Sequence, residues 1–119
     1  MIRNATRNVD IASEITYCNS FLRRGLGLMC RRSLGKDEAY VFVERQESLT
    51  NTAITMLFVF FPITVIWLNN DKRVVGKVLA RPWRLIYAPD SPARYYVEAH
   101  PSAWNKVEIG DMLTFSEPI

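Results

Sequence analysis

The sequence predicts a mainly β fold: a single-domain β-sandwich of jelly-roll-like form, or a partly closed barrel, with about seven short strands and one short helix near residues 20–30. Short apolar stretches recur along the chain between turn-forming Asn, Asp, Gly and Pro residues. The length of 119 residues suits one domain, 1–119, with a core over about 9–115. Hydrophobic residues at 49% and aromatic residues at 12% exclude a disordered or collagen-like chain.

The N-terminal part predicts one strand followed by the helix. Residues 8–17 alternate between apolar and polar, which is typical of a half-buried strand, with a small-residue interruption at Ala12-Ser13. Asn19 or Ser20 can cap the helix, whose apolar stripe lies opposite an arginine-rich face. Because Gly25 and Gly27 weaken a helix, this one must be held by packing.

The central part predicts three strands and no membrane span. Residues 39–43 read as a brief strand, 44–51 as a polar loop, and 53–60 as a strand covered on both sides. The uncharged run 54–68 is shorter than the ~20 residues of a spanning helix and contains Pro62. Two buried strands meeting at Pro62 are therefore expected.

The C-terminal half predicts a hairpin, a long loop and two further strands. Residues 63–68 and 73–79 flank an Asn/Asp cluster that favours a turn. The connection 81–94 contains three prolines, so it is neither helix nor central strand. Residues 95–99 form a strand, and 112–115 form the closing strand after a Gly110-Asp111 turn.

Five motifs in order resemble one known family. They are RGLGLMCRRSL at 24–34, the Met-containing apolar segment with its proline at 56–68, RVV at 73–75, ARYYVE at 93–98 and IGD at 109–111. Together they resemble the domain of unknown function 192 over residues of about 9–115. The resemblance implies a compact β-sandwich of jelly-roll type with one short helix, and it implies no activity.

The chain departs from the pattern of this family in three places. Many members carry Trp-Met before the proline and Asp two residues after it, where this chain has Thr55-Met56 and Thr64. A binding site that used that Asp would have to use another residue here. Many members are exported, whereas residues 1–20 hold no signal-peptide core, so a cytoplasmic location is expected.

The loop 81–95 is the preferred candidate site because it interleaves aromatic residues with arginines. Its candidate ligand-binding residues are Trp83, Arg84, Tyr87, Arg94 and Tyr95. Such a mixture can stack on rings and bind anionic groups, and long loops on a rigid scaffold often carry sites. The leading hypothesis is a non-enzymatic module that binds a small anionic or ring-containing ligand. The alternative is that Trp83 and Tyr87 only pack the loop onto the core.

A basic segment offers a weaker anion site. Its arginines are Arg23, Arg24, Arg31 and Arg32. They could bind phosphate or carboxylate, or bind nucleic acid weakly, although the net charge of +3 is small. The plainer interpretation is the solvated face of an amphipathic helix.

The enzymatic alternative is a hydrolase acting on a saccharide or phosphoester through Glu98 or Asp111, with His100, the single histidine, nearby. The sequence contains no G-x-S-x-G turn, P-loop or metal-ligand spacing, so no cofactor or metal is expected. Cys18 and Cys30 are expected to be free thiols packed as small hydrophobes.

The oligomeric state is open between monomer and homodimer. The run 56–67 holds more apolar residues than one sandwich interior need hide, so part of it could lie at an interface.

Overall fold

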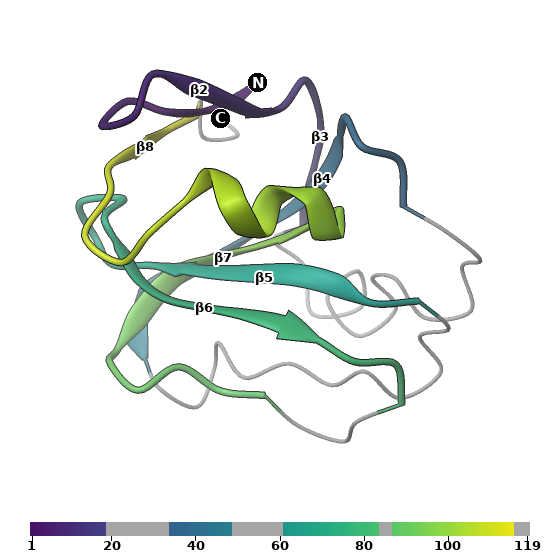
Figure 1. Cartoon of the computed structure of the whole chain (residues 1–119). Helices are drawn as coiled ribbons and strands as arrows, with labels where there is room; N and C mark the ends of the chain where they lie inside the picture. Colours follow the sequence, from purple (N-terminus) through teal and green to yellow (C-terminus); the bar gives the residue numbers. More distant parts are fainter. Residues whose placement is uncertain (19–33, 49–60, 84–86, 116–119) are drawn as a thin grey trace.

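The computed structural model describes residues 1–18, 34–48, 61–83 and 87–115 (Figure 1). The elements in chain order are β1 (Ile2–Asn4), β2 (Val9–Ala12), β3 (Glu14–Cys18), β4 (Glu38–Ser48), β5 (Ile63–Leu68), β6 (Val74–Ala80), β7 (Ala93–Ala99), the 3-10 helix η1 (Pro101–Lys106) and β8 (Leu113–Thr114). The predicted helix near 20–30, the predicted strand 53–60 and Cys30 lie outside the described residues. None of the helices in the described part is long and apolar enough to cross a membrane.

The strands form a small and a large sheet. The small sheet has the order β2-β1-β8, and the large sheet has the order β3-β4-β7-β5-β6. Strand β3 pairs with β4 in parallel, and the other pairs are antiparallel. The predicted mainly β class is confirmed, and the described strands form two sheets rather than a closed barrel.

The strand predicted over residues 8–17 is divided between the two sheets. Residues up to Ala12 belong to β2 of the small sheet, and residues from Glu14 belong to β3 of the large one. The chain crosses at Ser13, where the backbone N–H groups of Ser13 and Glu14 both donate to the Asp37 carbonyl. The small-residue interruption in the sequence pattern therefore marks a change of sheet.

Strand β4 is longer than predicted. It continues through the predicted polar loop 44–51 as far as Ser48, because β7 pairs with it again at Ala93. The register shifts between Val43 and Ser48. Because such an irregularity interrupts the regular alternation of side chains, the sequence pattern does not reveal this part of the strand. The sequence analysis predicted neither the short strand β1 nor the helix η1.

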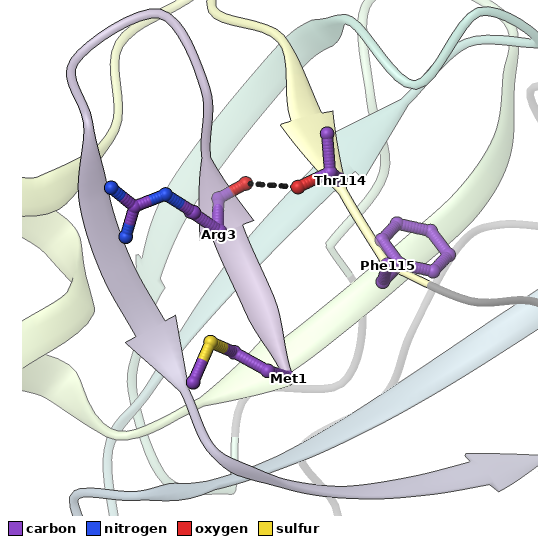
Figure 2. Close-up of a pocket in the computed structure, with 4 residues that line it drawn as sticks. All are labelled: Met1, Arg3, Thr114 and Phe115. Atoms are coloured by element: carbon purple, nitrogen blue, oxygen red, sulfur yellow. Dashed lines mark hydrogen bonds between the residues drawn. The ribbon is translucent and has the colours of Figure 1, made fainter.

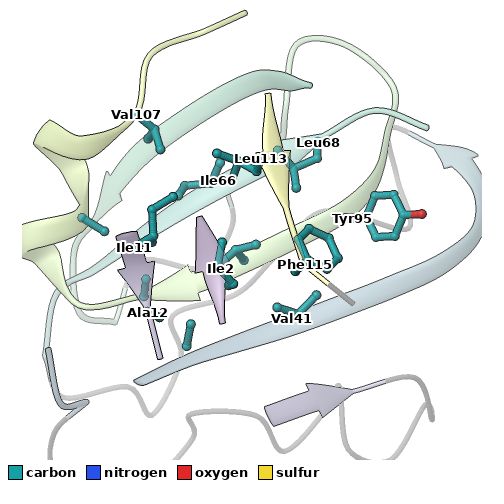
Figure 3. Close-up of a cluster of buried hydrophobic side chains, with 14 of the residues drawn as sticks. Ile2, Ile11, Ala12, Val41, Ile66, Leu68, Tyr95, Val107, Leu113 and Phe115 are labelled. Atoms are coloured by element: carbon teal, nitrogen blue, oxygen red, sulfur yellow. The ribbon is translucent and has the colours of Figure 1, made fainter. Parts of the chain in front are cut away.

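The main core lies between the two sheets. Figure 3 shows Ile2 of β1 and Leu113 of β8 facing Val41, Ile66 and Leu68 of the large sheet. All five side chains are buried. This interior holds the small sheet against one face of the large sheet.

The opposite face of the large sheet carries a second buried cluster. Phe42 and Tyr96 stack with ring centroids 4.4 Å apart, and Trp67 lies beside Tyr96 on β5. A side chain at Gly76 would begin 3.4 Å from the Trp67 ring, so the glycine leaves room for the indole. All six residues of β5 are buried, and residues 56–60 of the apolar run lie outside the described residues.

Candidate functional site

One end of the second face gathers the polar and aromatic residues of interest. Across the strands, Tyr40 of β4, Glu98 of β7, Val65 of β5 and Val78 of β6 lie in one row. Beyond this row β4 and β5 begin, and β6 and β7 end (Figure 1). We call this region, with residues 81–83 and Tyr87 of the loop that follows β6, the Glu98 end.

Glu98 is a buried acid on an aromatic face. Its neighbours in the strand, Val97 and Ala99, point into the main core, so Glu98 points to the second face with Tyr96. The residue is 8% exposed, and within the described part of the chain no hydrogen bond or ion pair holds its carboxyl. Burial raises its pKa from 4.5 to about 8. At neutral pH the carboxyl is therefore mostly protonated.

The loop after β6 returns to its own start and presents Trp83. The Arg81 backbone N–H donates to the Tyr87 hydroxyl at 2.8 Å, which ties residue 87 back to the end of β6. The Trp83 ring is 46% exposed, and its backbone φ of 66° lies in the left-handed region. That conformation is unusual for a bulky residue.

The predicted loop site is divided by the structure. Tyr95 pairs with Leu68 and Val43, at the far end of β7 from Glu98. Its ring is 1% exposed and meets Phe115 edge-on in the main core, at a centroid distance of 5.4 Å. Arg94 lies at the same far end, where its Nε donates to the Glu44 carbonyl and its guanidinium lies 5.1 Å from the Tyr95 ring.

Trp83 and Tyr87 thus lie at one end of the large sheet, and Arg94 and Tyr95 lie at the other. Arg84 lies outside the described residues, as do the candidate anion-binding residues Arg23, Arg24, Arg31 and Arg32.

Asp111 holds the two ends of the chain together. Its Oδ2 accepts hydrogen bonds from Asn4 Nδ2 at 2.8 Å, Arg7 Nε at 2.6 Å and the Glu108 backbone N–H at 2.9 Å. Burial raises the pKa of Asp111, but these three hydrogen bonds and the Arg7 charge outweigh it and bring the pKa below its usual value. The carboxylate is therefore ionised at neutral pH and serves a structural role.

His100 caps η1. Its Nδ1 accepts the Ser102 backbone N–H at 3.1 Å and lies 2.9 Å from the Ser102 hydroxyl. Glu98 faces away from the small sheet, whereas Asp111 bonds to Asn4 within it. The structure therefore does not gather the three predicted hydrolase residues into one site.

A shallow pocket lies at the small sheet. Figure 2 shows its lining, namely Met1, Arg3, Thr114 and Phe115, none of which the sequence singled out. The Arg3 guanidinium is engaged by Asp10 and Asn8, and the Thr114 hydroxyl donates to the Arg3 carbonyl. Across the described residues, no group of three or more His, Cys, Asp or Glu side chains is placed to hold a metal ion.

Sequence reasoning missed Asn4, Arg7 and Lys77 as anchoring residues. The Lys77 ammonium donates to the carbonyls of Trp104 and Val107, each at 2.9 Å. Arg7 and Asp111 are 104 positions apart in the chain, so no local pattern connects them.

Comparison with known proteins assigns the family. Residues 2–115 match the profile of DUF192, which is described as "Uncharacterized ACR". The chain belongs to the DUF192 family. The resemblance seen in the sequence motifs is thereby confirmed.

Relatives in this family extend over nearly the whole chain. A UPF0127 protein of Pyrococcus furiosus is 35% identical over 98% of both chains. A UPF0127 protein of Thermococcus kodakarensis is 33% identical over 98% of this chain and 73% of its own length. A third, of Pyrococcus horikoshii, is 37% identical over 82% of both.

Two solved structures share the fold. A protein of unknown function from Novosphingobium aromaticivorans has a TM-score of 0.84 and 19% identity over 96% of this chain and 82% of its own. A Sinorhizobium meliloti protein that has been proposed as a transcription regulator has a TM-score of 0.82 and 19% identity over 95% and 88%. At this identity the likeness extends to the fold alone.

Proposed function

We propose that this DUF192 protein is a binding module that takes a small ring-containing ligand at the Glu98 end, with the Trp83 indole as a stacking surface. The exposed Trp83 ring in a left-handed backbone conformation carries the proposal. An indole offers a π-face to aromatic rings and an apolar face to sugar rings.

A contribution to folding stability does not by itself explain the left-handed backbone and the exposure of Trp83. The left-handed conformation costs about 1–2 kcal/mol for a residue with a side chain. Trp83 buries part of its surface, but 46% of the residue stays exposed, which leaves apolar surface for a ligand. Backbone strain of this kind tends to persist at binding sites.

Of the two ligand classes suggested by the sequence, the ring-containing class fits the described residues better. Arg94 lies at the other end of β7, and its guanidinium already contacts the Glu44 carbonyl and the Tyr95 ring. The hydrolase alternative loses support, because Asp111 is bonded to Asn4 and Arg7 and the His100 Nδ1 is bonded to Ser102.

The test is an NMR titration of the labelled full chain with benzamide, methyl β-glucoside and inorganic phosphate. We expect a ring probe to shift the Trp83 indole signal, and Trp83→Ala to abolish the remaining shifts at the Glu98 end. Ile109→Ala is the matched control, since Ile109 is also an exposed apolar residue but follows η1.

Trp83→Phe keeps a ring and should retain part of the binding. A response to phosphate alone, or ring binding that is unchanged in Trp83→Ala, would refute the assignment of Trp83.

A further inference from the structure

We infer that Glu98 is the polar contact of this site, where as a neutral carboxylic acid it pairs with a ligand edge that offers a hydrogen-bond acceptor beside a donor, as a carboxamide or cyclic imide does. This inference rests on the proposed ring-binding function and specifies its ligand class.

The first support for the inference is the buried position of Glu98. Its residue is more than nine-tenths buried, yet the described part of the chain supplies its carboxyl with no hydrogen bond or ion pair. Buried polar groups in folded proteins are nearly always hydrogen-bonded, so a carboxyl that the described residues leave unengaged is suited to a ligand partner.

The surroundings of Glu98 decide its charge state. Its cross-strand neighbours on the second face are the phenol ring of Tyr40 and the side chain of Val65, and Tyr96 precedes it on the same face. Arg94, on the same strand, lies at the opposite end of β7. Desolvation by burial favours the neutral acid, which has one donor and one acceptor side by side.

The sheet register places Glu98 at the end of the large sheet where β6 leads into Trp83. Glu98 pairs with Val65, two residues from Ile63, which pairs with Ala80 at the end of β6. The two Cα atoms, of Glu98 and Ala80, are therefore about 7 Å apart along the strands and about 10 Å apart across them. Trp83 follows Ala80 by three residues, so both Trp83 and Glu98 belong to the same end of the large sheet.

Three probes that share one ring separate the chemical alternatives. Benzamide is neutral and offers acceptor and donor together, benzoate is an anion, and benzylammonium is a cation. The full chain, Glu98→Gln and Glu98→Leu would be titrated with each probe by NMR. Both variants place an uncharged side chain in a buried position, so both are expected to fold.

We expect benzamide to bind the unmodified chain more tightly than the two charged probes do. Glu98→Gln keeps a donor and an acceptor and should bind benzamide within about threefold of the unmodified chain, whereas Glu98→Leu should weaken it at least about tenfold. Signals of Tyr40 and Val65 should shift together with the Trp83 indole.

Three results would overturn the inference. Unchanged benzamide binding in Glu98→Leu would remove Glu98 from the site, and the Trp83 proposal would stand if Trp83→Ala still abolished binding. Tighter binding of benzylammonium that Glu98→Gln abolishes would show an anionic role. Absence of shifts near Glu98 with every probe would exclude this ligand class. Conversely, benzamide binding that is lost in Glu98→Leu but kept in Trp83→Ala would refute the Trp83 proposal alone.

Discussion

Two carboxyl groups in this protein show how local surroundings shift the pKa of one chemical group in opposite directions. Glu98 is buried among apolar and aromatic neighbours, and its pKa rises to about 8. Asp111 is equally buried but accepts three hydrogen bonds, one of them from an arginine, and its pKa falls. Desolvation acts on both carboxyls, and only the presence of donors decides the direction of the shift.

Glu98 should make the free energy of unfolding decrease with rising pH. Below pH 4.5 the carboxyl is protonated in both states; between 4.5 and about 8 only the folded state keeps the proton, so stability falls; above 8 the loss is complete. Glu98→Gln lacks this titration. The variant should match the unmodified chain near pH 5 and exceed it at pH 9 by a few kcal/mol in urea unfolding.

The difference between the two chains isolates Glu98 from all other titrating groups. Parallel pH profiles for the two proteins would show that the Glu98 carboxyl is ionised in the folded state.

At the scale of elements, Lys77 anchors η1 to strand β6. The Lys77 side chain is 11% exposed, donates to the last carbonyls of η1 and lies 4.0 Å from the Trp104 ring centroid. A cation at the C-terminal end of a helix satisfies carbonyls that have no partner within the helix. This contact holds η1 beside β5 and β6.

Lys77→Met should destabilise the protein by about 2 kcal/mol, because it keeps the aliphatic stem but leaves those carbonyls without their charged donor. Urea unfolding at pH 7 measures the effect. Lys36→Met is the control, since Lys36 is exposed, and it should change stability by less than about 0.5 kcal/mol. Equal effects of the two substitutions would contradict an anchoring role for Lys77.

At the scale of the whole molecule, contacts between the N- and C-terminal parts close the small sheet over the core. Ala5 N–H donates to the Met112 carbonyl, and Met112 N–H donates to the Thr6 hydroxyl, each at 2.8 Å. Asp111 adds its bonds to Asn4 and Arg7. The small sheet therefore depends on both ends of the chain.

Asp111→Asn should cost about 2–3 kcal/mol at pH 7, because the hydrogen bonds lose their charge and one buried donor group competes with the Arg7 guanidinium. The Asp111 pKa is lowered in the folded state, so its contribution is present above the ordinary pKa of the carboxyl and is lost as pH falls through the lowered value. The difference between the two proteins should therefore shrink in acid. Asp90→Asn, at an exposed aspartate, is the control for unfolding measurements.

Several parts of this fold could be predicted because they depend on neighbours in the chain. The hairpin of β5 and β6 was expected from Asn69 to Asp71, and in the structure the Asn69 side chain accepts the backbone N–H groups of Asp71 and Arg73. The strand at β7 and the turn at Gly110, with its φ of 96°, also follow from local signals.

The candidate site could be predicted only in part, because the register between strands cannot be read from the pattern of neighbouring residues in the sequence. Tyr87, Arg94 and Tyr95 are close in sequence, yet Tyr95 pairs with Leu68 at the end of β5 and points into the main core. Glu98, three residues further along β7, pairs with Val65 and points to the second face. The loop folds back to the Glu98 end instead, through the Tyr87 hydroxyl.

The sequence by itself determined the mainly β class, the family and most strand positions, because alternation and turn chemistry act over a few residues. Only the tertiary structure decided which sheet each strand joins and that β3 runs parallel to β4. It also decided that the Glu98 carboxyl is buried without a hydrogen bond from the described part of the chain, while Asp111 accepts three hydrogen bonds. These properties depend on contacts between residues far apart in the chain, and burial and hydrogen bonding are set by those contacts.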